Sequence, residues 1–392
     1  MSDQINALIK ESTTSFYVFD IAALKQRIRT LRTSLPETLS LCYAVKANPF
    51  LVKEIADEAD RFEICSPGEL EICRKLGIAS EKMVISGVYK TPKMLEELAA
   101  DTDFRGIVTI ESLRQYEILC GQVKKYGNRI PVLLRLTNGS QFGIGREEIE
   151  HIVAEREKHG DISILGIQYF SGTQKVSARK LKREIEHLDQ FLGRLETEYG
   201  YRAEELEYGT GFPVAYFEED KLDEQELFQS FSQQVGSMCT HPAITIELGR
   251  SMAASCGQYY THVVDWKQNK GQNYLLVDGR MHQMVYFGQY MAMKPPFFGV
   301  CGKEDAPKEE VWNICGSLCT MNDIILKQAS LPKMELGDVL CFQNTGAYCM
   351  TEGISLFLSR DLPAVYLLLE NGELLQVRKS YDTAELNMPV YE

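Results

Sequence analysis

The chain has 392 residues, of which 44% are hydrophobic and 25% charged, and its formal net charge is -13. This length is enough for two domains with separate cores, and the composition excludes a disordered or fibrous chain. The charges are spread along the sequence without long blocks of one sign, which argues against a nucleic-acid-binding surface. We therefore expect a globular protein with no nucleic-acid partner.

The cysteines and the N-terminus bear on where the protein works. The 11 cysteines include no CxxC pair and no spacing typical of Cys/His metal ligands, and several lie inside apolar runs such as Leu41-Cys42-Tyr43. Residues 1–11 are polar, and no later stretch approaches the roughly 18 apolar residues that span a membrane. We expect buried thiols, no metal site, no membrane contact and a cytoplasmic location.

The first two thirds of the chain alternates between two kinds of segment. Apolar runs rich in β-forming residues recur at 39–45, 61–65, 82–86, 106–110, 131–136, 162–169, 204–208 and 243–247. Helical spacing marks the intervening segments 68–76, 93–100, 112–125 and 180–197. Repeated strand–helix units favour parallel strands, and this number of them predicts an α/β fold of the (β/α)8, TIM-like barrel type. A doubly wound open sheet is the alternative.

After about residue 257 the pattern changes. Strand-like runs at 257–264, 273–278, 308–315, 338–344, 363–369 and 373–378 are joined by turn-forming residues. They predict a separate all-β domain, with a Greek-key-like barrel or sandwich arrangement. The early run 15–19 has no evident place in the barrel, so we expect it to return to the β-domain ahead of a helical segment at 21–34. The predicted domains are a barrel at 23–256 and an all-β domain at 257–392, joined by an N-terminal strand at 14–22.

The first predicted barrel strand ends in Tyr43-Ala44-Val45-Lys46-Ala47-Asn48-Pro49. A lysine at the mouth of a barrel is partly desolvated, which lowers its pKa and leaves an amine able to attack an aldehyde. A lysine that simply reaches to water is the alternative. Lys46 is therefore a candidate nucleophile.

The last two predicted strands end in groups that suit a phosphorylated cofactor. Gly209-Thr210-Gly211 can bring backbone N–H groups to a phosphate, although a structural tight turn would look the same. Glu247 and Arg250 follow the eighth strand, where a structural ion pair is the alternative. With Lys46 they supply an amine for an aldehyde, a phosphate site and an acid for a pyridine nitrogen. This combination predicts pyridoxal 5'-phosphate (PLP).

The sequence resembles the ornithine/diaminopimelate/arginine decarboxylase family, which has the alanine-racemase type of fold. The resemblance rests on motifs in the family's order: 43–48, Phe62-Glu63-Ile64-Cys65-Ser66, Gln141-Phe142-Gly143, Gly172-Thr173-Gln174, 209–211, 247–250, Asp278-Gly279, Leu318-Cys319 and Gly346-Ala347-Tyr348. It implies a PLP-dependent carboxy-lyase that acts on an amino acid.

The resemblance also implies roles for individual residues. Lys46 would bind PLP as a Schiff base and Glu247 would pair with the pyridine nitrogen. The other cofactor-binding residues would be Arg135, Phe170, Thr173, Gly209, Thr210, Gly211, Gly249, Arg250 and Tyr348. The family is dimeric with shared active sites, so Cys319 would enter the partner's site and help to protonate the substrate carbon after CO2 leaves.

Departures from the family pattern concern the substrate. Phe170 replaces a histidine that stacks on the cofactor, and Thr210 replaces a glycine. Thr320 stands where an acid usually binds a distal amine, and losing that charge-assisted bond costs about 1.5–3 kcal/mol. Lys294 is the one candidate cation in the region 290–297, where diaminopimelate decarboxylases bind a distal carboxylate.

The expected substrate is therefore an amino acid with a modified or acyl-carrier-protein-bound side chain, as in the butirosin-type branch of the family. Its predicted contacts are Thr320, Asp323, Gln141 and His282. The Met-rich segment 284–298 would line an entrance for a tethered group, or else pack in an interface. Free diaminopimelate, lysine or ornithine is the alternative substrate.

Two other functions remain open at this point. An amino-acid racemase on the same fold needs a second proton-transfer residue, and Tyr259, Tyr260 and Tyr286 lie in no recognisable racemase motif. A regulatory relative without catalysis is disfavoured because the chain retains Lys46 and Cys319.

Overall fold

The computed structural model describes residues 3–353 and 355–390, except for the side chain of residue 159. The chain divides into two compact units. One, the barrel unit, consists of residues 28–213 and 222–252; the other, the β-unit, consists of residues 1–27, 214–221 and 253–392. The predicted boundaries at 23–256 and 257–392 stay a proposal, and residues 391–392 lie outside the described part of the chain.

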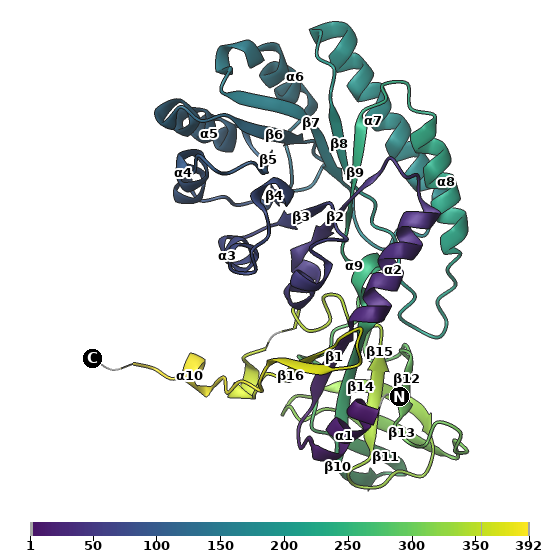
Figure 1. Ribbon diagram of the computed structural model, residues 1–392. Helices are drawn as coiled ribbons and strands as arrows, with labels where there is room; N and C mark the ends of the chain where they lie inside the picture. The colour runs from purple at the N-terminus through teal and green to yellow at the C-terminus, as the bar shows by residue number, and fades with distance from the viewer. Residues whose placement is uncertain (1–2, 354, 391–392) are drawn as a thin grey trace. The chain divides into compact units, whose positions relative to one another are not determined.

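The barrel unit is a closed barrel of eight parallel strands, β2 to β9 in chain order (Figure 1). The strands are β2 (Ser40–Ala44), β3 (Arg61–Ile64), β4 (Met83–Ile85), β5 (Ile107–Ile110), β6 (Ile130–Arg135), β7 (Ile162–Phe170), β8 (Glu205–Gly209) and β9 (Ala243–Leu248). Strand β2 closes the barrel by pairing with β9 in parallel, with Cys42 opposite Glu247. The predicted TIM-like barrel is therefore confirmed, and the open-sheet alternative is wrong.

Helix α2 (Ile21–Ser34) precedes the first barrel strand, and other helices follow most of the barrel strands. These are α3 (Pro67–Lys75), α4 (Pro92–Ala100), α5 (Leu113–Tyr126), α6 (Arg146–Ala154), α7 (Ala178–Tyr199), α8 (Glu224–Gly236) and the short α9 (Arg250–Ala253). Ser66, Thr91 and Ser112 precede α3, α4 and α5, and each side chain accepts a hydrogen bond from the N–H three residues later. These caps start the helices directly after the strands, because they satisfy N–H groups that the first turn leaves free.

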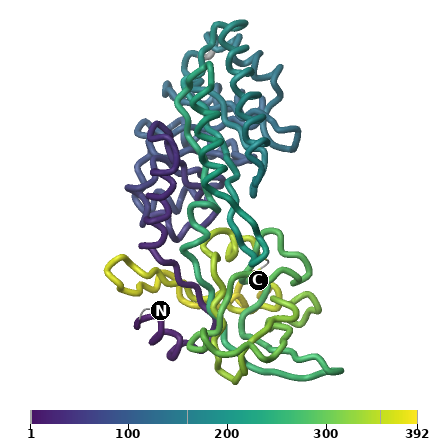
Figure 2. The backbone as a smooth tube through the Cα atoms, turned by 90° about the vertical axis from the view of Figure 1, so that its right-hand side faces the viewer, coloured from purple at the N-terminus to yellow at the C-terminus, as the bar shows by residue number. Residues whose placement is uncertain are grey.

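Among the described residues, the β-unit is built on one connected sheet of nine strands. Figure 2 shows that the backbone of this unit combines the purple N-terminal segment with green and yellow segments from later in the chain. Its strands are β1 (Phe16–Asp20), β10 (Gly257–Asn269), β11 (Gln272–Val277), β12 (Phe298–Val300), β13 (Glu310–Cys315), β14 (Ile324–Leu331), β15 (Val339–Gln343), β16 (Ala364–Leu368) and β17 (Leu374–Arg378). Short helices α1 (Asp3–Glu11) and α10 (Ala384–Asn387) belong to the same unit. The predicted all-β domain is thus confirmed as a fold class.

The N-terminal strand lies inside this sheet. Strand β1 is antiparallel to β10 and parallel to β16, with Phe16 opposite both Tyr260 and Ala364. Phe16, Tyr260 and Ala364 share a buried cluster with Val339 and Cys341 of neighbouring strands. Four consecutive buried residues of β1, Phe16 to Phe19, therefore supply part of the core of a sheet whose other strands come from the last third of the chain.

Among the described residues, no helix has the length and apolar character needed to cross a membrane.

Candidate active site at the carboxyl end of the barrel

Lys46 lies in a short 3-10 turn (Val45–Ala47) directly after β2, at the carboxyl end of the barrel strands. Its Nζ forms an ion pair with Glu63 of β3 and lies 3.4 Å from Cys65 Sγ. Burial alone would raise the pKa of Glu63, but the Lys46 ammonium and its hydrogen bond lower it below the usual value. The lysine side chain keeps 42% of its surface exposed, so its amine is held by an anion and is still open to a ligand.

Glu247 is the penultimate residue of β9, on the inner side of the barrel. Its Oε1 accepts a hydrogen bond of 2.7 Å from Gln168 Nε2 of β7. The neighbouring strand β8 carries a second acid, the fully buried Glu207, which acts on the pKa of Glu247. Burial and the charge of Glu63 raise the pKa of Glu247, while Glu207, Lys46 and Gln168 act in the opposite direction. The site therefore contains a carboxyl pair that the sequence had not indicated.

The turn after β8 packs closely against neighbouring protein atoms at its two glycines. A Cβ added to Gly209 would lie 2.4 Å from the Phe170 ring and 3.1 Å from Glu247 Oε2. Gly211 has a φ of 61°, and an added Cβ would lie 2.2 Å from the carbonyl oxygen of Gly172. Only glycine fits these two positions without rearrangement, because any side chain would meet backbone or ring atoms. Between them, Thr210 is fully buried.

These residues fit PLP on two counts. The amine of Lys46 and the carboxyl of Glu247 supply the groups that an aldehyde and a pyridine nitrogen require, and both lie at the same end of the barrel. The turn at 209–211 contains two glycines at which no side chain fits, and Arg250 begins α9 immediately after β9. A guanidinium and a glycine turn at strand ends are suited to a phosphate.

Arg135 ends β6 as part of a buried ion pair. Its Nη1 lies 2.5 Å from Glu111 Oε1, and its guanidinium stacks 4.8 Å from the Phe142 ring. Gly143 N–H donates to the second Glu111 oxygen at 3.3 Å. Arg135 also contributes to the lowered pKa of Glu63, which places its charge near the Lys46 pair. The predicted position of Arg135 close to the cofactor and Lys46 stays a prediction.

Lys90 is a second buried lysine in the barrel unit. It is 3% exposed and its Nζ donates to the carbonyl oxygen of Gly87 at 2.8 Å. Burial lowers its pKa to about 8, although Glu111 opposes this shift.

Behind the glycine turn lies another network that sequence reasoning missed. Lys175, with 1% of its side chain exposed, pairs with Glu184 of α7 at 2.7 Å. Glu184 also accepts hydrogen bonds from Ser171 and Tyr208 hydroxyls at 2.5 and 2.6 Å. The backbone N–H of Lys175 donates to the carbonyl oxygen of Gly211 at 2.9 Å, so this network is hydrogen-bonded directly to the glycine turn. The one signal in the sequence was a lysine placed next to the Gly172-Thr173-Gln174 motif.

The predicted substrate residues of the β-unit lie on and beside the turn between β13 and β14. Asp323 is buried, and its two carboxylate oxygens accept hydrogen bonds from the N–H groups of Met281 and Leu318 at 2.8 and 2.7 Å. Cys319 is exposed and Thr320 half-buried on the same turn. Asp323 thus shapes the turn that presents these two side chains; its predicted contact with a substrate is not tested by this geometry.

The remaining predicted residues are found in varied settings. Gln141 is exposed in the barrel unit, while Thr173 and Gly249 are half-buried there. In the β-unit the His282 ring packs against Phe357 at 5.6 Å. Tyr348 has a φ of 65°, and its carbonyl oxygen accepts two backbone hydrogen bonds of 2.9 Å.

The three tyrosines considered for a racemase are buried inside the β-unit. The hydroxyl of Tyr259 donates to Gln283 at 2.5 Å, that of Tyr260 to Gln258 at 2.7 Å, and that of Tyr286 to the Gln343 carbonyl at 2.5 Å. Burial raises the pKa of all three phenols. Hydroxyls engaged in this way are poorly placed to exchange protons with a substrate, so a racemase is not favoured.

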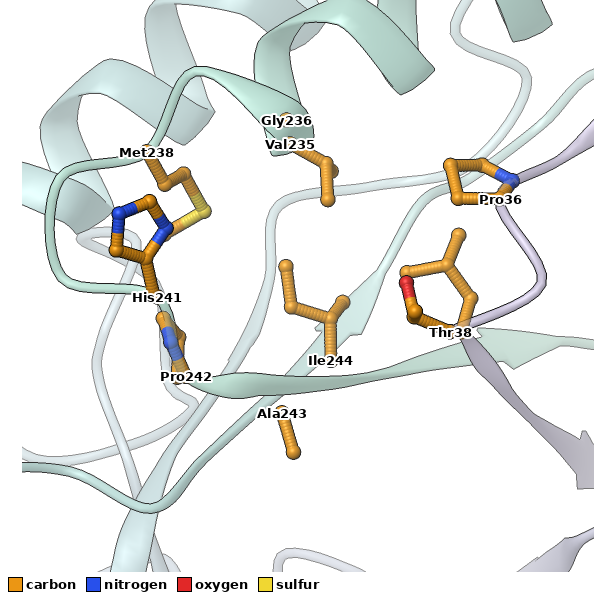
Figure 3. Close-up of a pocket in the computed structure, with 10 residues that line it drawn as sticks. Pro36, Thr38, Val235, Gly236, Met238, His241, Pro242, Ala243 and Ile244 are labelled. Carbon is orange, nitrogen blue, oxygen red and sulfur yellow. The ribbon is translucent and has the colours of Figure 1, made fainter.

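A separate pocket lies at the other end of the barrel (Figure 3). It has a volume of about 240 Å³ and is lined mainly by apolar residues near the amino ends of β2 and β9, including Leu39, Val235, Met238 and Ile244. It contains no amine or carboxylate, so the chemistry belongs to the opposite end.

A parallel eight-stranded barrel with a lysine, a half-buried acid and a glycine turn at its strand ends defines a PLP-dependent barrel enzyme. The comparisons with known proteins specify this class further. The family model described as "Pyridoxal-dependent decarboxylase, pyridoxal binding domain" matches residues 21–254. The chain therefore belongs to the pyridoxal-dependent decarboxylase family, and PLP is its cofactor.

Curated relatives match almost the whole chain. The L-glutamyl-[BtrI acyl-carrier protein] decarboxylase of Niallia circulans is 26% identical, over 96% of this chain and 93% of the relative. The diaminopimelate decarboxylase of Aquifex aeolicus is 27% identical, over 94% and 90%. Among solved structures, a diaminopimelate decarboxylase from M. jannaschii superposes with a TM-score of 0.87 at 21% identity, covering 97% of this chain and 93% of that one, which supports the fold.

Proposed function

We propose that this PLP-dependent amino-acid decarboxylase acts on an α-amino acid whose side chain is modified or carried by an acyl-carrier protein. The observation that carries the proposal is Thr320, a hydroxyl at the position where the family's resemblance calls for an acid. The preceding Cys319 is exposed and the adjacent Asp323 carboxylate is occupied by two backbone N–H groups. A free distal ammonium would therefore find no available carboxylate on this turn.

Lys294, the candidate cation for a distal carboxylate, supports the same choice of substrate. Lys294 lies 3.9 Å from Glu219 and 5.2 Å from the Phe217 ring, so its charge already has partners within the β-unit. A distal carboxylate of diaminopimelate would have to compete with these contacts. Among the relatives, the glutamyl-carrier-protein decarboxylase is an example of an enzyme whose substrate needs no binding site for a distal ammonium or a distal carboxylate.

In this proposal residues of the barrel unit, together with Tyr348 of the β-unit, hold the cofactor. Lys46 would bind PLP covalently, Glu247 would pair with the pyridine nitrogen, and Arg135 and Phe170 would lie beside the ring. The phosphate would be bound by Thr173, Gly209, Thr210, Gly211, Gly249, Arg250 and Tyr348. When bound, PLP supplies an aldehyde for the substrate amine and a protonated ring that withdraws electrons from the bond to the departing carboxylate.

Side chains of the protein would then hold the charges in place and transfer the proton. Glu63 keeps the Lys46 amine oriented through their ion pair. Glu247, as an anion, keeps the proton on the ring nitrogen. Cys319 Sγ would deliver the proton that replaces the carboxylate at the substrate Cα. Gln141, His282, Thr320 and Asp323 would surround the substrate side chain.

We further propose a homodimer in which Cys319 serves the partner's site, which its exposed position on the turn allows. A cytoplasmic location is part of the same proposal and rests on the 11 cysteines, which are free thiols as expected in a reducing compartment.

The test is mass spectrometry of products after the yellow, PLP-loaded protein is incubated in D2O. Parallel samples contain glutamyl-loaded carrier protein or free diaminopimelate, lysine, ornithine, arginine or glutamate. Loss of CO2 with one deuterium gained at Cα only on the carrier-bound amino acid is the expected result. The same change on a free diamino acid would overturn the carrier proposal and favour the second candidate, a diaminopimelate decarboxylase, which the Aquifex aeolicus relative exemplifies.

A further inference from the structure

Strand β8 directs two glutamates into the barrel, and they have very different surroundings. Glu205 pairs with Arg61 and accepts a hydrogen bond of 2.7 Å from the Thr245 hydroxyl. Glu207, two residues later, is fully buried, and no N–H or O–H of the described residues donates to either of its oxygens. A buried carboxylate without donors is costly, so Glu207 must be satisfied in another way.

Glu247, on the adjacent strand β9, is the second acid in this part of the barrel. Gly209, two residues after Glu207, lies opposite Glu247 on β9, and Gln168 lies opposite Glu207 on β7. Gln168 Nε2 already donates to Glu247 Oε1 at 2.7 Å, so its side chain reaches across the position of Glu207. Two carboxyl groups side by side inside a protein share a proton, because two neighbouring anions repel strongly there.

The surroundings decide which carboxyl group carries the proton. The titratable and charged groups that face Glu207 are Cys42, Arg61, Glu63, Glu205 and Glu247. The one cation of this set, Arg61, is committed to Glu205. Burial and then the Glu247 charge raise the pKa of Glu207 well above its usual value. Burial and the Glu63 charge raise the pKa of Glu247 as well, but Glu247 also has the Gln168 amide and the Lys46 charge, which act in the opposite direction and stabilise its anion.

We propose that Glu207 stays protonated and donates a hydrogen bond to Glu247, which makes it a positioning residue for the acid that faces the PLP ring nitrogen. Glu207 and Gln168 then donate to Glu247 from two strands and keep it an oriented anion. This inference rests on the proposed role of Glu247. It adds Glu207, on a different strand from Glu247, to the residues that set the charge of the cofactor.

Infrared difference spectroscopy tests the protonation directly. The PLP-loaded protein is compared with Glu207→Gln, and Glu205→Gln is the matched control on the same strand. The C=O stretch of a protonated carboxylic acid, present at pH 8, is expected to disappear in Glu207→Gln and to persist in Glu205→Gln. Persistence of the band in Glu207→Gln would overturn the proposal. The measurement needs no turnover, so it stands whether or not a substrate is found.

Cofactor affinity and colour provide the second readout. Glu207→Gln keeps a donor and should bind PLP within about threefold of the unmodified protein, with an unchanged pH titration of its absorbance. Glu207→Leu removes the donor and should weaken PLP binding by about 10- to 100-fold. Equal weakening by both substitutions would contradict the proposal, because it would mean that the charge of Glu207 is needed. If Glu207→Leu does not fold, the glutamine variant and the infrared band decide.

Discussion

The mouth of the barrel and the turn between β13 and β14 present functional side chains in different ways. At the mouth, charged groups are bound to one another, as in the Lys46–Glu63 and Arg135–Glu111 pairs. On the turn, a buried Asp323 binds backbone N–H groups, and Cys319 and Thr320 face outward from that scaffold.

This contrast indicates where the chain can vary. Lys46 and Arg135 at the mouth are each paired with a buried carboxylate, so a change in either pair leaves one charge uncompensated. The turn is held by backbone hydrogen bonds, so its outward side chains can change without loss of structure. Substitutions should therefore affect the cofactor and the stability at the mouth, and selectivity at the turn.

The largest effect is expected from Lys46→Ala. Removing the amine should abolish the yellow PLP–lysine colour and lower kcat by on the order of 10³-fold or more, because the group that holds the cofactor is lost. Lys53→Ala, at an exposed lysine seven residues later, is the control and should change neither property. Absorbance spectra and product formation measure both. A Lys46→Ala protein that kept its colour and rate would disprove the assignment.

Glu111→Gln should be the most destabilising of the charge changes. It leaves the buried Arg135 guanidinium without its partner, and breaking a buried pair costs about 3–5 kcal/mol in the free energy of unfolding. Urea unfolding followed by circular dichroism measures this. Glu96→Gln breaks the exposed pair with Lys125 and should leave the urea midpoint unchanged. Equal shifts in the two variants would argue against the importance of burial at the mouth.

Lys90 should make stability depend on pH in the alkaline range. Its pKa falls from the usual 10.5 to about 8 in the folded chain because of burial, so the unfolded chain binds more protons between these values. The free energy of unfolding should therefore rise with pH across this window. Lys90→Met should flatten the rise and Lys93→Met, at a lysine 86% exposed, should preserve it. Unfolding curves at several pH values give the comparison; an unchanged slope in Lys90→Met would refute it.

The smallest effect concerns the turn. Thr320→Asp restores the acid that the family resemblance calls for and should raise kcat/KM for free diamino acids about tenfold, with little change in stability. Asn322→Asp puts the same charge two residues away on an exposed position and serves as the control. Competition between diamino acids and a carrier-bound substrate measures selectivity. If both variants behave alike, Thr320 does not determine the substrate.

Local patterns in the sequence were sufficient to predict the barrel strands and the placement of Lys46, Glu247 and the 209–211 turn at one end. Each depends on short-range features: an apolar run, a following turn, a characteristic motif. Strands β12 and β14 were missed, because β12 has only three residues and β14 contains polar residues such as Lys327 and Gln328.

Long-range pairing explains what else could not be predicted. In the sequence, Glu207 is simply another acid in Glu205-Leu206-Glu207, and its place beside Glu247 depends on strand register across the barrel. The Lys175–Glu184 pair likewise joins a loop to a helix face. In the 284–298 segment, Tyr290 and Met293 are exposed by 71% and 64%, which the apolar sequence alone does not reveal.

Strand β1 has a consequence for how the molecule is made. It pairs with β10 and β16, so every barrel strand is synthesised between β1 and its neighbours. On a ribosome, β1 therefore stays unpaired until the barrel sequence and β10 have emerged, and its other edge stays open until β16 follows. Pairings of such long sequence separation form slowly. A nascent chain arrested before β16 would hold a complete barrel sequence beside an open sheet edge, a natural binding place for a chaperone.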